Sequence, residues 1–373
     1  MQRAQVWRQF DFLLLAFFLV LIALGVAMIR SANLGTPDLA DLWRTQATYA
    51  AVGLALFLLL ALIPYTWLRQ VWWAGYLLAI ALLVLVLIIG ESEIGDVRRW
   101  FYVGTFRFQP SFPAMLLHVV TMAAVLDEKS REHRVEMEGE AVGEPPGLLL
   151  YILSGVMAFL LAGLVFLEPD MSTAMVFIVI WIAVAFIART RLLYFLLTAF
   201  LGLAAVVPLW QVMKPYQQER VLTFFFPTRD PGALYNINQS LISIGSGGLW
   251  GQDYGAGSQS QLHFLRVRHT DFIFSVVAEE LGFIGAMLVI VLFVLLAWRM
   301  MRAAIRAPDR FGQLLVVGAG AILFFPLVVN IGMSIGLLPV TGLPLPFISY
   351  GGTSLLTSMM ALGLIANVAL RGR

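Results

Sequence analysis

Ten long apolar segments divide this chain, and they restrict its fold more than any other feature of the sequence. Nearly all have about 18 or more residues, enough for a helix to cross a hydrocarbon core about 30 Å thick. The segments lie at 12–29, 46–64, 71–90, 111–126, 148–167, 171–188, 192–213, 271–298, 313–335 and 351–370. The sequence therefore predicts an all-α integral membrane protein with about ten transmembrane helices.

The composition points to the same class. Hydrophobic residues make up 60% of the chain and charged residues 12%, about half the charged share of a soluble domain. A net charge of +2 gives no reason to expect nucleic acid as a partner. Without cysteine, the chain has no disulfide, thiolate metal ligand or cysteine nucleophile. We expect one polytopic domain over residues 1–373, with the first apolar segment retained as a signal anchor.

Basic residues indicate the orientation of the segments. An even number of segments places both termini on one side of the membrane. The connections at 189–191 and 299–310 are rich in arginine, which predicts that they lie in the cytoplasm, and we expect the charged loop 127–147 there too. The outer face then receives three long stretches, at 91–110, 214–270 and 336–350.

These three outer stretches carry most of the candidate chemistry. The stretch 91–110 is a loop rich in arginine and aromatic residues, and a binding role competes there with simple anchoring at the membrane surface. The loop 214–270 contains an expected amphipathic helix at 235–244. It also contains a glycine-rich run at 245–257, which is either flexible or admits an anion to backbone amides. The proline-rich stretch 336–350 predicts a broken element, tolerated where it is buried or lines a cavity.

The centre of the expected site is His269-Thr270-Asp271, where the loop 214–270 meets the eighth apolar segment. We expect Thr270 to be the N-cap of that helix, and Asp271 to lie in its first turn, where the helix dipole favours an acid. The alternative is that Asp271 only helps to start the helix. A carboxylate among arginines can deprotonate a hydroxyl beside an anionic lipid headgroup. The residues alone leave open a transferase using a lipid pyrophosphate and a transporter of that lipid.

Several polar residues fall within or beside the apolar segments. Intramembrane acids such as Glu279 and Glu280 are functional candidates, although an inward-facing structural pair explains them equally well. Further candidates for a polar interior are His118, Glu168, Asp170 and Asn330. Each of these four, taken singly, is more often a packing or topology residue than a site. The four histidines show no metal-ligand spacing.

Many of these residues fall in ordered motifs. The motifs are Arg99-Trp100, Gln109-Pro110-Ser111, Glu168-Pro169-Asp170, Tyr235-Asn236, Gln239-Ser240-Leu241, His269-Thr270-Asp271, AEELGF at 278–283, and Ser349-Tyr350-Gly351-Gly352. With these motifs the chain resembles, over nearly its whole length, the SEDS family of RodA, FtsW and SpoVE proteins. The resemblance implies a peptidoglycan glycosyltransferase of the bacterial cytoplasmic membrane, active on its outer face in cell-wall synthesis, shape or division.

The resemblance also implies roles for particular residues and partners. Asp271 would be the catalytic residue, taking the proton from the GlcNAc 4-hydroxyl of lipid II. The substrate-binding candidates are Arg99, Trp100, Gln109, Ser111, Arg220, Gln239, Arg266, Arg268, His269, Thr270, Ser349 and Tyr350. Implied partners are lipid II, the nascent glycan strand, membrane lipid and a class B penicillin-binding protein. A divalent cation, Mg²⁺ or Mn²⁺, is the one cofactor considered, as a help to the arginines in neutralising the pyrophosphate.

The chain departs from the family pattern at two positions. Phe112 and Met115 stand where the family usually has Glu and Lys. One interpretation is a salt bridge lost as a pair at small cost, with His118 taking over some polar function. The other is a member that is weakly active, or active only with its partner. The alternatives to a polymerase are a lipid II flippase and a non-catalytic scaffold that activates the transpeptidase. Polar residues concentrate in the outer half, which favours the polymerase.

Overall fold

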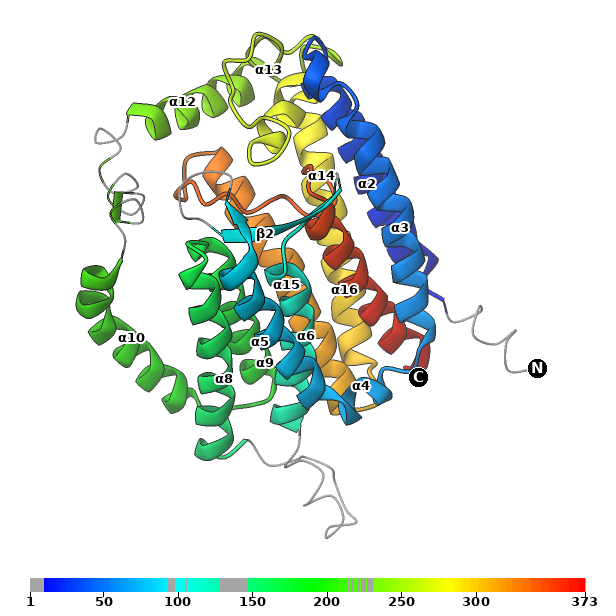
Figure 1. The fold of residues 1–373 in the computed structure, drawn as a ribbon. Helices are drawn as coiled ribbons and strands as arrows, with labels where there is room; N and C mark the ends of the chain where they lie inside the picture. Colours follow the sequence, from blue (N-terminus) through cyan, green and yellow to red (C-terminus); the bar gives the residue numbers. More distant parts are fainter. Residues whose placement is uncertain are drawn as a thin grey trace. The chain divides into compact units, whose positions relative to one another are not determined.

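The computed structural model describes residues 10–92, 98–104, 106–127, 146–213 and 231–372, together with residues 215, 218, 219, 222 and 226. Every predicted apolar segment corresponds to one helix (Figure 1). These helices are α2 (Phe12–Ala32), α3 (Leu42–Leu62), α5 (Trp72–Ile89), α6 (Ser111–Asp127), α8 (Leu148–Leu167), α9 (Met171–Ile187), α10 (Leu192–Val212), α14 (Ile273–Ile305), α15 (Arg310–Ser334) and α16 (Gly352–Arg371).

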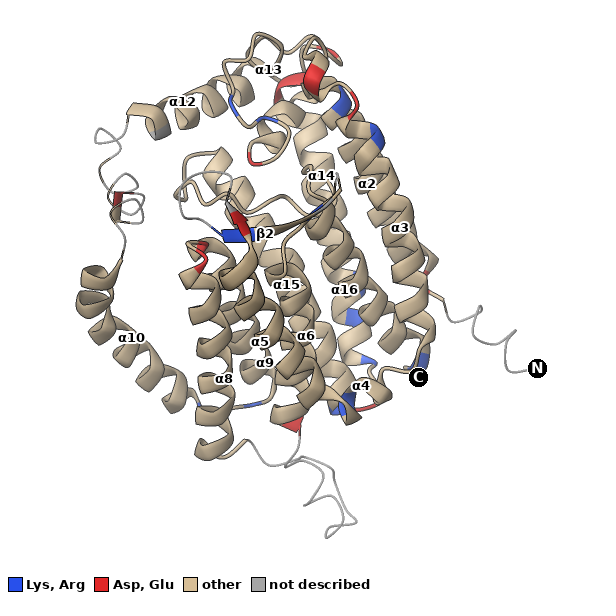
Figure 2. Ribbon diagram, in the orientation of Figure 1, with Lys and Arg blue, Asp and Glu red and all other residues tan. Residues whose placement is uncertain are grey.

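The helices have the length and composition that a membrane requires. Within the described residues, eight are long and apolar enough to span a bilayer. Two shorter apolar helices, α6 and α9, have 17 residues each, which corresponds to about 25 Å at 1.5 Å per residue. Figure 2 shows no charged residue along α5, α8 or α10. The prediction of an all-α membrane protein is confirmed.

The chain forms two compact units. The first unit comprises Met1–Leu59, Glu219–Met300 and Leu323–Met360. Besides parts of the long helices it holds η1 (Pro37–Leu39), α12 (Pro231–Ser246) and α13 (Ser258–Gln261). Phenylalanine rings form its core. The ring of Phe347 packs 6.1 Å from that of Phe18 and 6.2 Å from that of Phe293, so the proline-rich stretch contributes to this core.

The second unit comprises Leu60–Gln218, Met301–Ile322 and Ala361–Arg373. Its helices α5, α6, α8 and α9 pack side by side (Figure 1), and α4 (Thr66–Gln70) precedes them. Trp181 of α9 is buried against Gly155 of α8 and donates a hydrogen bond of 3.0 Å to Ser154. By contrast, α10 has no buried residue. Tyr151 of α8 forms hydrogen bonds with the carbonyl of Tyr194 and the hydroxyl of Thr198, both in the first two turns of α10.

The outer stretch 91–110 is not simply a loop, as the sequence had suggested. It forms three short antiparallel strands, β1 (Glu91–Ser92), β2 (Arg98–Val103) and β3 (Phe106–Phe108), in the order β1-β2-β3. Phe101 pairs with Phe108 and Val103 with Phe106 across a turn at Gly104, whose φ of +64° suits glycine. Strands rich in aromatic residues therefore build a small sheet that leads directly into α6.

The eighth apolar segment is also more complex than one straight helix. Gly282, with φ +67° and ψ −167°, interrupts α14. The glycine-rich run packs against this break: a Cβ on Gly251 would lie 2.1 Å from the carbonyl oxygen of Glu280. The amide of Gln252 donates to the carbonyl of Glu279 at 3.0 Å, and the amide of Phe283 donates to the carbonyl of Gly248 at 2.9 Å. The loop thus satisfies backbone groups that the broken helix leaves open. Its glycines allow a close approach of the loop to α14, a packing role that neither of the two sequence interpretations, flexibility or an anion site, had included.

The proline-rich stretch 336–350 has no regular helix or strand, as predicted. Leu343, Leu345 and Ile348 are fully or almost fully buried. Gln46 of α3 anchors the end of the stretch, donating to the carbonyl of Ser349 at 3.0 Å and accepting from the amide of Gly351 at 3.3 Å. Irregular backbone within a membrane protein needs internal partners of this kind, and the second half of the stretch, from Leu343 to Ser349, is largely buried within the first unit.

Candidate active site

Asp271 is half-buried and lies two residues before α14 begins at Ile273. Its carboxylate oxygen Oδ2 would lie 3.6 Å from a Cβ on Gly342, so the proline-rich stretch passes directly beside it. Thr270 is not the N-cap that the sequence predicted. Its hydroxyl donates to the carbonyl of Val267 at 3.4 Å, within a series of turns. The predicted position of Asp271 in the first helical turn was wrong by these two residues.

The proline-rich stretch and α15 hold the backbone of the His-Thr-Asp motif. Ser349 is buried, and its hydroxyl donates to the carbonyl of Thr270 at 2.6 Å. The amide of Tyr350 donates to the carbonyl of His269 at 2.9 Å. Ser349 and Tyr350 were predicted to bind substrate, and both contact the backbone next to Asp271. Their side of the site is therefore fixed before a substrate arrives.

His269 has an unusually apolar setting for a histidine. Its ring packs edge-on against Tyr350, with centroids 6.0 Å apart. No hydrogen-bond partner for Nδ1 is found among the described residues. Burial, followed by the charge of Arg268, lowers the pKa of His269 to about 4. The imidazole is therefore neutral at pH 7 and adds no charge beside Asp271.

The arginines predicted to bind the pyrophosphate have different settings. Arg268 is buried, and its guanidinium donates to the carbonyl of Ala32, at the end of α2, and to the hydroxyl of Thr36 at 3.0 Å. Arg266 is exposed, and its guanidinium lies 5.8 Å from the ring centre of Tyr235. Arg220 lies outside the described residues. Arg266 is thus the more accessible of the two described arginines in this loop.

The predicted amphipathic helix at 235–244 is confirmed as α12, which is longer than expected. Ser240 is buried and shares a hydrogen bond of 2.6 Å with Ser275 of α14. Gln239, a predicted substrate-binding residue, is half-buried. Its side-chain oxygen, like that of Asn236 one turn earlier, is buried without a hydrogen-bond partner among the described residues. Two buried amide oxygens without partners therefore lie one turn apart on α12.

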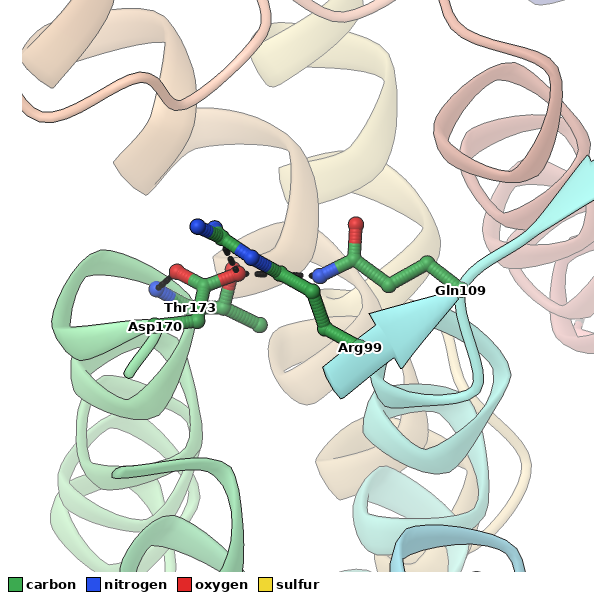
Figure 3. A network of polar contacts seen from close by, with 4 residues as sticks. All are labelled: Arg99, Gln109, Asp170 and Thr173. Atoms are coloured by element: carbon green, nitrogen blue, oxygen red, sulfur yellow. Dashed lines mark hydrogen bonds and ion pairs between the residues drawn. The ribbon is translucent and has the colours of Figure 1, made fainter. Parts of the chain in front are cut away.

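In the second unit, three residues meet around the carboxylate of Asp170 (Figure 3). Asp170 is the N-cap of α9, accepting from the amide of Thr173 at 3.1 Å. It also accepts from the side-chain amide of Gln109 at 2.9 Å, and the guanidinium of Arg99 lies 3.8 Å away. Figure 3 shows Arg99 reaching this carboxylate from β2 and Gln109 from the segment before α6. The structure therefore brings two predicted substrate-binding residues, Arg99 and Gln109, to the carboxylate of Asp170, which lies about sixty residues later in the sequence.

Trp100 and Ser111 flank this cluster in the sequence. Trp100 is half-buried in β2 and pairs with Glu91. Ser111 begins α6 and is fully buried, and its hydroxyl has no hydrogen-bond partner in the described part of the chain. Where the family pattern has Glu and Lys, Phe112 is half-buried and Met115 is buried. His118 is buried too, and Nε2 donates to the carbonyl of Phe177 at 3.2 Å, a contact within the helix packing.

Glu168 was only a general candidate from sequence, but its environment is unusual. The side chain is fully buried, and neither carboxylate oxygen has a hydrogen-bond partner among the described residues. Burial raises the pKa of Glu168 to about 9, with a further increase from Asp170 and a decrease from Arg99. It lies between two apolar segments in the sequence, and this position is the signal that could have identified it.

The two intramembrane glutamates each have hydrogen-bond donors. Glu280 accepts from the hydroxyl of Ser31 at 2.6 Å. Glu279 accepts from the amides of Gln259 at 2.7 Å and Ser260 at 3.2 Å, at the start of α13. These contacts support the structural interpretation of the pair. Within the described residues, no group of three or more His, Asp or Glu side chains could hold a metal ion.

The fold and these sites define a polytopic all-α membrane protein with a fixed acidic motif at one end of a broken helix. The model of the FtsW, RodA and SpoVE family, described as cell cycle proteins, matches residues 11–373. The chain belongs to this family, and the resemblance seen in the sequence is confirmed.

Curated relatives and solved structures agree with this assignment. Stage V sporulation protein E of Bacillus subtilis is 35% identical, over 96% of each chain. Peptidoglycan glycosyltransferase MrdB of Escherichia coli K12 is 37% identical, over 85% of this chain and 83% of that protein. A chain of a peptidoglycan synthase complex has a TM-score of 0.78 at 32% identity, covering 96% of this chain and 97% of its own. The rod shape determining protein RodA of Thermus thermophilus has a TM-score of 0.70 at 29% identity, over 96% of each chain.

Proposed function

We propose that this protein is a peptidoglycan glycosyltransferase that polymerises lipid II. The observation that carries the proposal is the half-exposed carboxylate of Asp271 on a backbone fixed by hydrogen bonds from two other parts of the chain. A general base needs such a position, because it must lie within about 3 Å of the hydroxyl that it deprotonates. The names of the relatives, which include peptidoglycan glycosyltransferases, support the same function.

In the proposed reaction, the 4-hydroxyl of the GlcNAc of one lipid II molecule is the nucleophile. Asp271 takes its proton as the oxygen attacks the anomeric carbon of the lipid-linked strand. A β-1,4 bond between O4 and C1 forms, and the bond from C1 to the phosphate oxygen breaks with inversion. Undecaprenyl pyrophosphate leaves with the bonding electron pair. Asp271 is the residue that this step requires, and His269, which is neutral at pH 7, adds no positive charge beside it.

The leaving pyrophosphate needs positive charge nearby, because charge develops on its oxygen as the bond breaks. Arg266, in the loop that leads to Asp271, has an exposed side chain and is the described candidate for this role in the first unit. Arg268 has two of its nitrogen atoms engaged by α2 and Thr36. A divalent cation would enter this scheme as an ion carried by the diphosphate, since Mg²⁺ is commonly bound by substrate phosphates and few carboxylates.

The proposed location is the bacterial cytoplasmic membrane, with Asp271 on the outer face, where lipid II units are joined. The proposed partner is a class B penicillin-binding protein. A relative of known structure comes from a complex that coordinates polymerization and crosslinking. The flippase alternative requires polar residues continuing through the bilayer. Glu279 and Glu280 were the best candidates for such a path, and their hydrogen bonds to α13 and Ser31 favour the polymerase instead.

The test is polymerisation of purified lipid II by the purified protein, alone and with its cognate transpeptidase. We expect glycan strands from the wild type, and a loss of about 10²- to 10⁴-fold in rate for Asp271→Asn, the usual contribution of general base catalysis. The matched control is Asp253→Asn. Asp253 is exposed in the same loop, and its φ of +70° suits asparagine. Full activity of Asp271→Asn would refute the mechanism, and an inactive wild type with and without the partner would favour the scaffold.

A further inference from the structure

Three consecutive backbone carbonyl groups, those of His269, Thr270 and Asp271, each accept a hydrogen bond from residues between 330 and 350. The donors are the amide of Tyr350 to His269 at 2.9 Å, the hydroxyl of Ser349 to Thr270 at 2.6 Å, and the side-chain amide of Asn330 to Asp271 at 2.9 Å. None of the three bonds belongs to a regular helix or sheet. They form a clamp that fixes the backbone leading to the carboxylate.

Asn330 has the most informative contacts of the three donors. It lies on α15, is fully buried, and donates a second hydrogen bond to the carbonyl of Leu343 at 2.8 Å. Leu343 follows Gly342, the residue against which the Asp271 carboxylate packs. One amide group therefore fixes both the backbone that carries the carboxylate and the backbone that lies beside it.

The partners of Asn330 show which backbone its amide fixes. An asparagine that only stabilised α15 would bond to its own helix, as Ser334 does in donating to the carbonyl of Asn330. Both partners of the Asn330 amide lie outside α15. The planar amide of Asn330 supplies both donors. An aspartate of the same shape has no donor when ionised, and leucine has none at all.

We propose that Asn330 is a positioning residue for Asp271, setting where the carboxylate meets the acceptor hydroxyl of the substrate. This inference rests on the proposed function of Asp271 as general base. A displacement of about 1 Å at a reacting group can cost about 10²-fold in rate, while binding of a large lipid substrate involves many other contacts. Loss of the Asn330 amide therefore lowers kcat and leaves KM nearly unchanged.

The experiment compares Asn330→Asp and Asn330→Leu with wild type in steady-state polymerisation of lipid II, together with thermal unfolding. The matched control is Asn367→Leu. Asn367 is also buried, and its amide donates to two backbone carbonyls, those of Leu60 and Ile63. We expect both Asn330 variants to lose about 10- to 100-fold in kcat with KM within about threefold. We expect Asn367→Leu to melt at a temperature as low or lower while keeping its kcat.

Three results would overturn the inference. The first is a kcat within twofold of wild type in the Asn330 variants when Asp271→Asn is inactive. The second is an equal fall in kcat for Asn367→Leu, which would make the effect one of stability. The third is an active Asp271→Asn variant, which would remove the proposed base and this inference with it. If neither Asn330 variant folds, Ser349→Ala removes the adjacent clamp bond, and an unchanged kcat in that variant decides against the proposal.

Discussion

Two acids separated by one proline show how environment decides the state of a carboxyl group. Asp170 accepts hydrogen bonds from Thr173 and Gln109 and faces the guanidinium of Arg99. Glu168 is buried with no such donor among the described residues, and its pKa rises to about 9. A buried carboxyl without donors is more stable neutral, because an isolated charge is costly to bury. Glu168 therefore carries a proton at pH 7, next to an ionic cluster.

This proton makes stability depend on pH in a direction that can be measured. The native state holds a proton that the unfolded chain releases near its ordinary pKa of 4.5. The contribution of Glu168 to the free energy of unfolding is therefore complete below that pH. It is lost as the pH rises toward about 9. Glutamine keeps the shape and cannot ionise. We expect the melting temperature of Glu168→Gln to match wild type near pH 5 and to exceed it by a growing margin up to pH 9.

Asp170→Asn is the contrasting variant for that experiment. It loses the charge that faces Arg99 and weakens the cap of α9, so it should melt below wild type at pH 7, in the opposite direction to Glu168→Gln. A margin for Glu168→Gln that stays constant across the pH range would show that Glu168 does not hold its proton in the native state.

At the level of single residues, the sequence identified the motif around Asp271 but not what holds it. Asp271 stood out because a long loop rich in arginine and glycine leads to it. The roles of Asn330 and Gln46 could not be read from their spacing, because both depend on the proline-rich stretch folding back onto the His-Thr-Asp motif. Arg268 shows the reverse case: a basic residue beside the motif is engaged largely by the end of α2.

Among the elements, the helices were predictable because each apolar run had the length of a membrane span. The three-stranded sheet was missed because its strands are only two, six and three residues long, and short strands give little periodicity. The break in α14 was also missed. Gly282 lies within the predicted apolar segment 271–298, and only the close approach of the glycine-rich run shows why the helix is interrupted there.

That close approach predicts an unequal response of two neighbouring glycines to alanine. Gly251 has φ +88°, and an added Cβ would meet the carbonyl of Glu280. Gly251→Ala should destabilise the protein by more than about 2 kcal/mol, from left-handed strain together with the clash. Gly245, within α12, has open space at its Cβ, so Gly245→Ala should be neutral or stabilising by up to about 1 kcal/mol. Thermal unfolding measures both, and equal effects would contradict the packing of the loop on α14.

For the molecule as a whole, the family assignment and the ten-helix architecture agree, while the single domain remains a prediction. The helices α3, α14, α15 and α16 each contribute residues to both compact units. The Asp271 motif and its clamp belong to the first unit, and the Asp170 cluster belongs to the second. Both occur at connections that the arginine pattern assigns to the outer face. The orientation of the chain is therefore the property on which the proposed outer-face chemistry depends.

The absence of cysteine makes this orientation testable with single cysteines. Leu262, in the long loop before Asp271, is 64% exposed, and Arg191, between α9 and α10, is also exposed. If the loop lies outside, a membrane-impermeant maleimide should label Leu262→Cys in intact bacterial cells and Arg191→Cys only after permeabilisation. The cysteine-free parent controls for background labelling, and lipid II polymerisation by each variant shows that the protein is folded. Labelling of Arg191→Cys in intact cells would reverse the orientation, and would place Asp271 on the face opposite to the one that the proposed reaction needs.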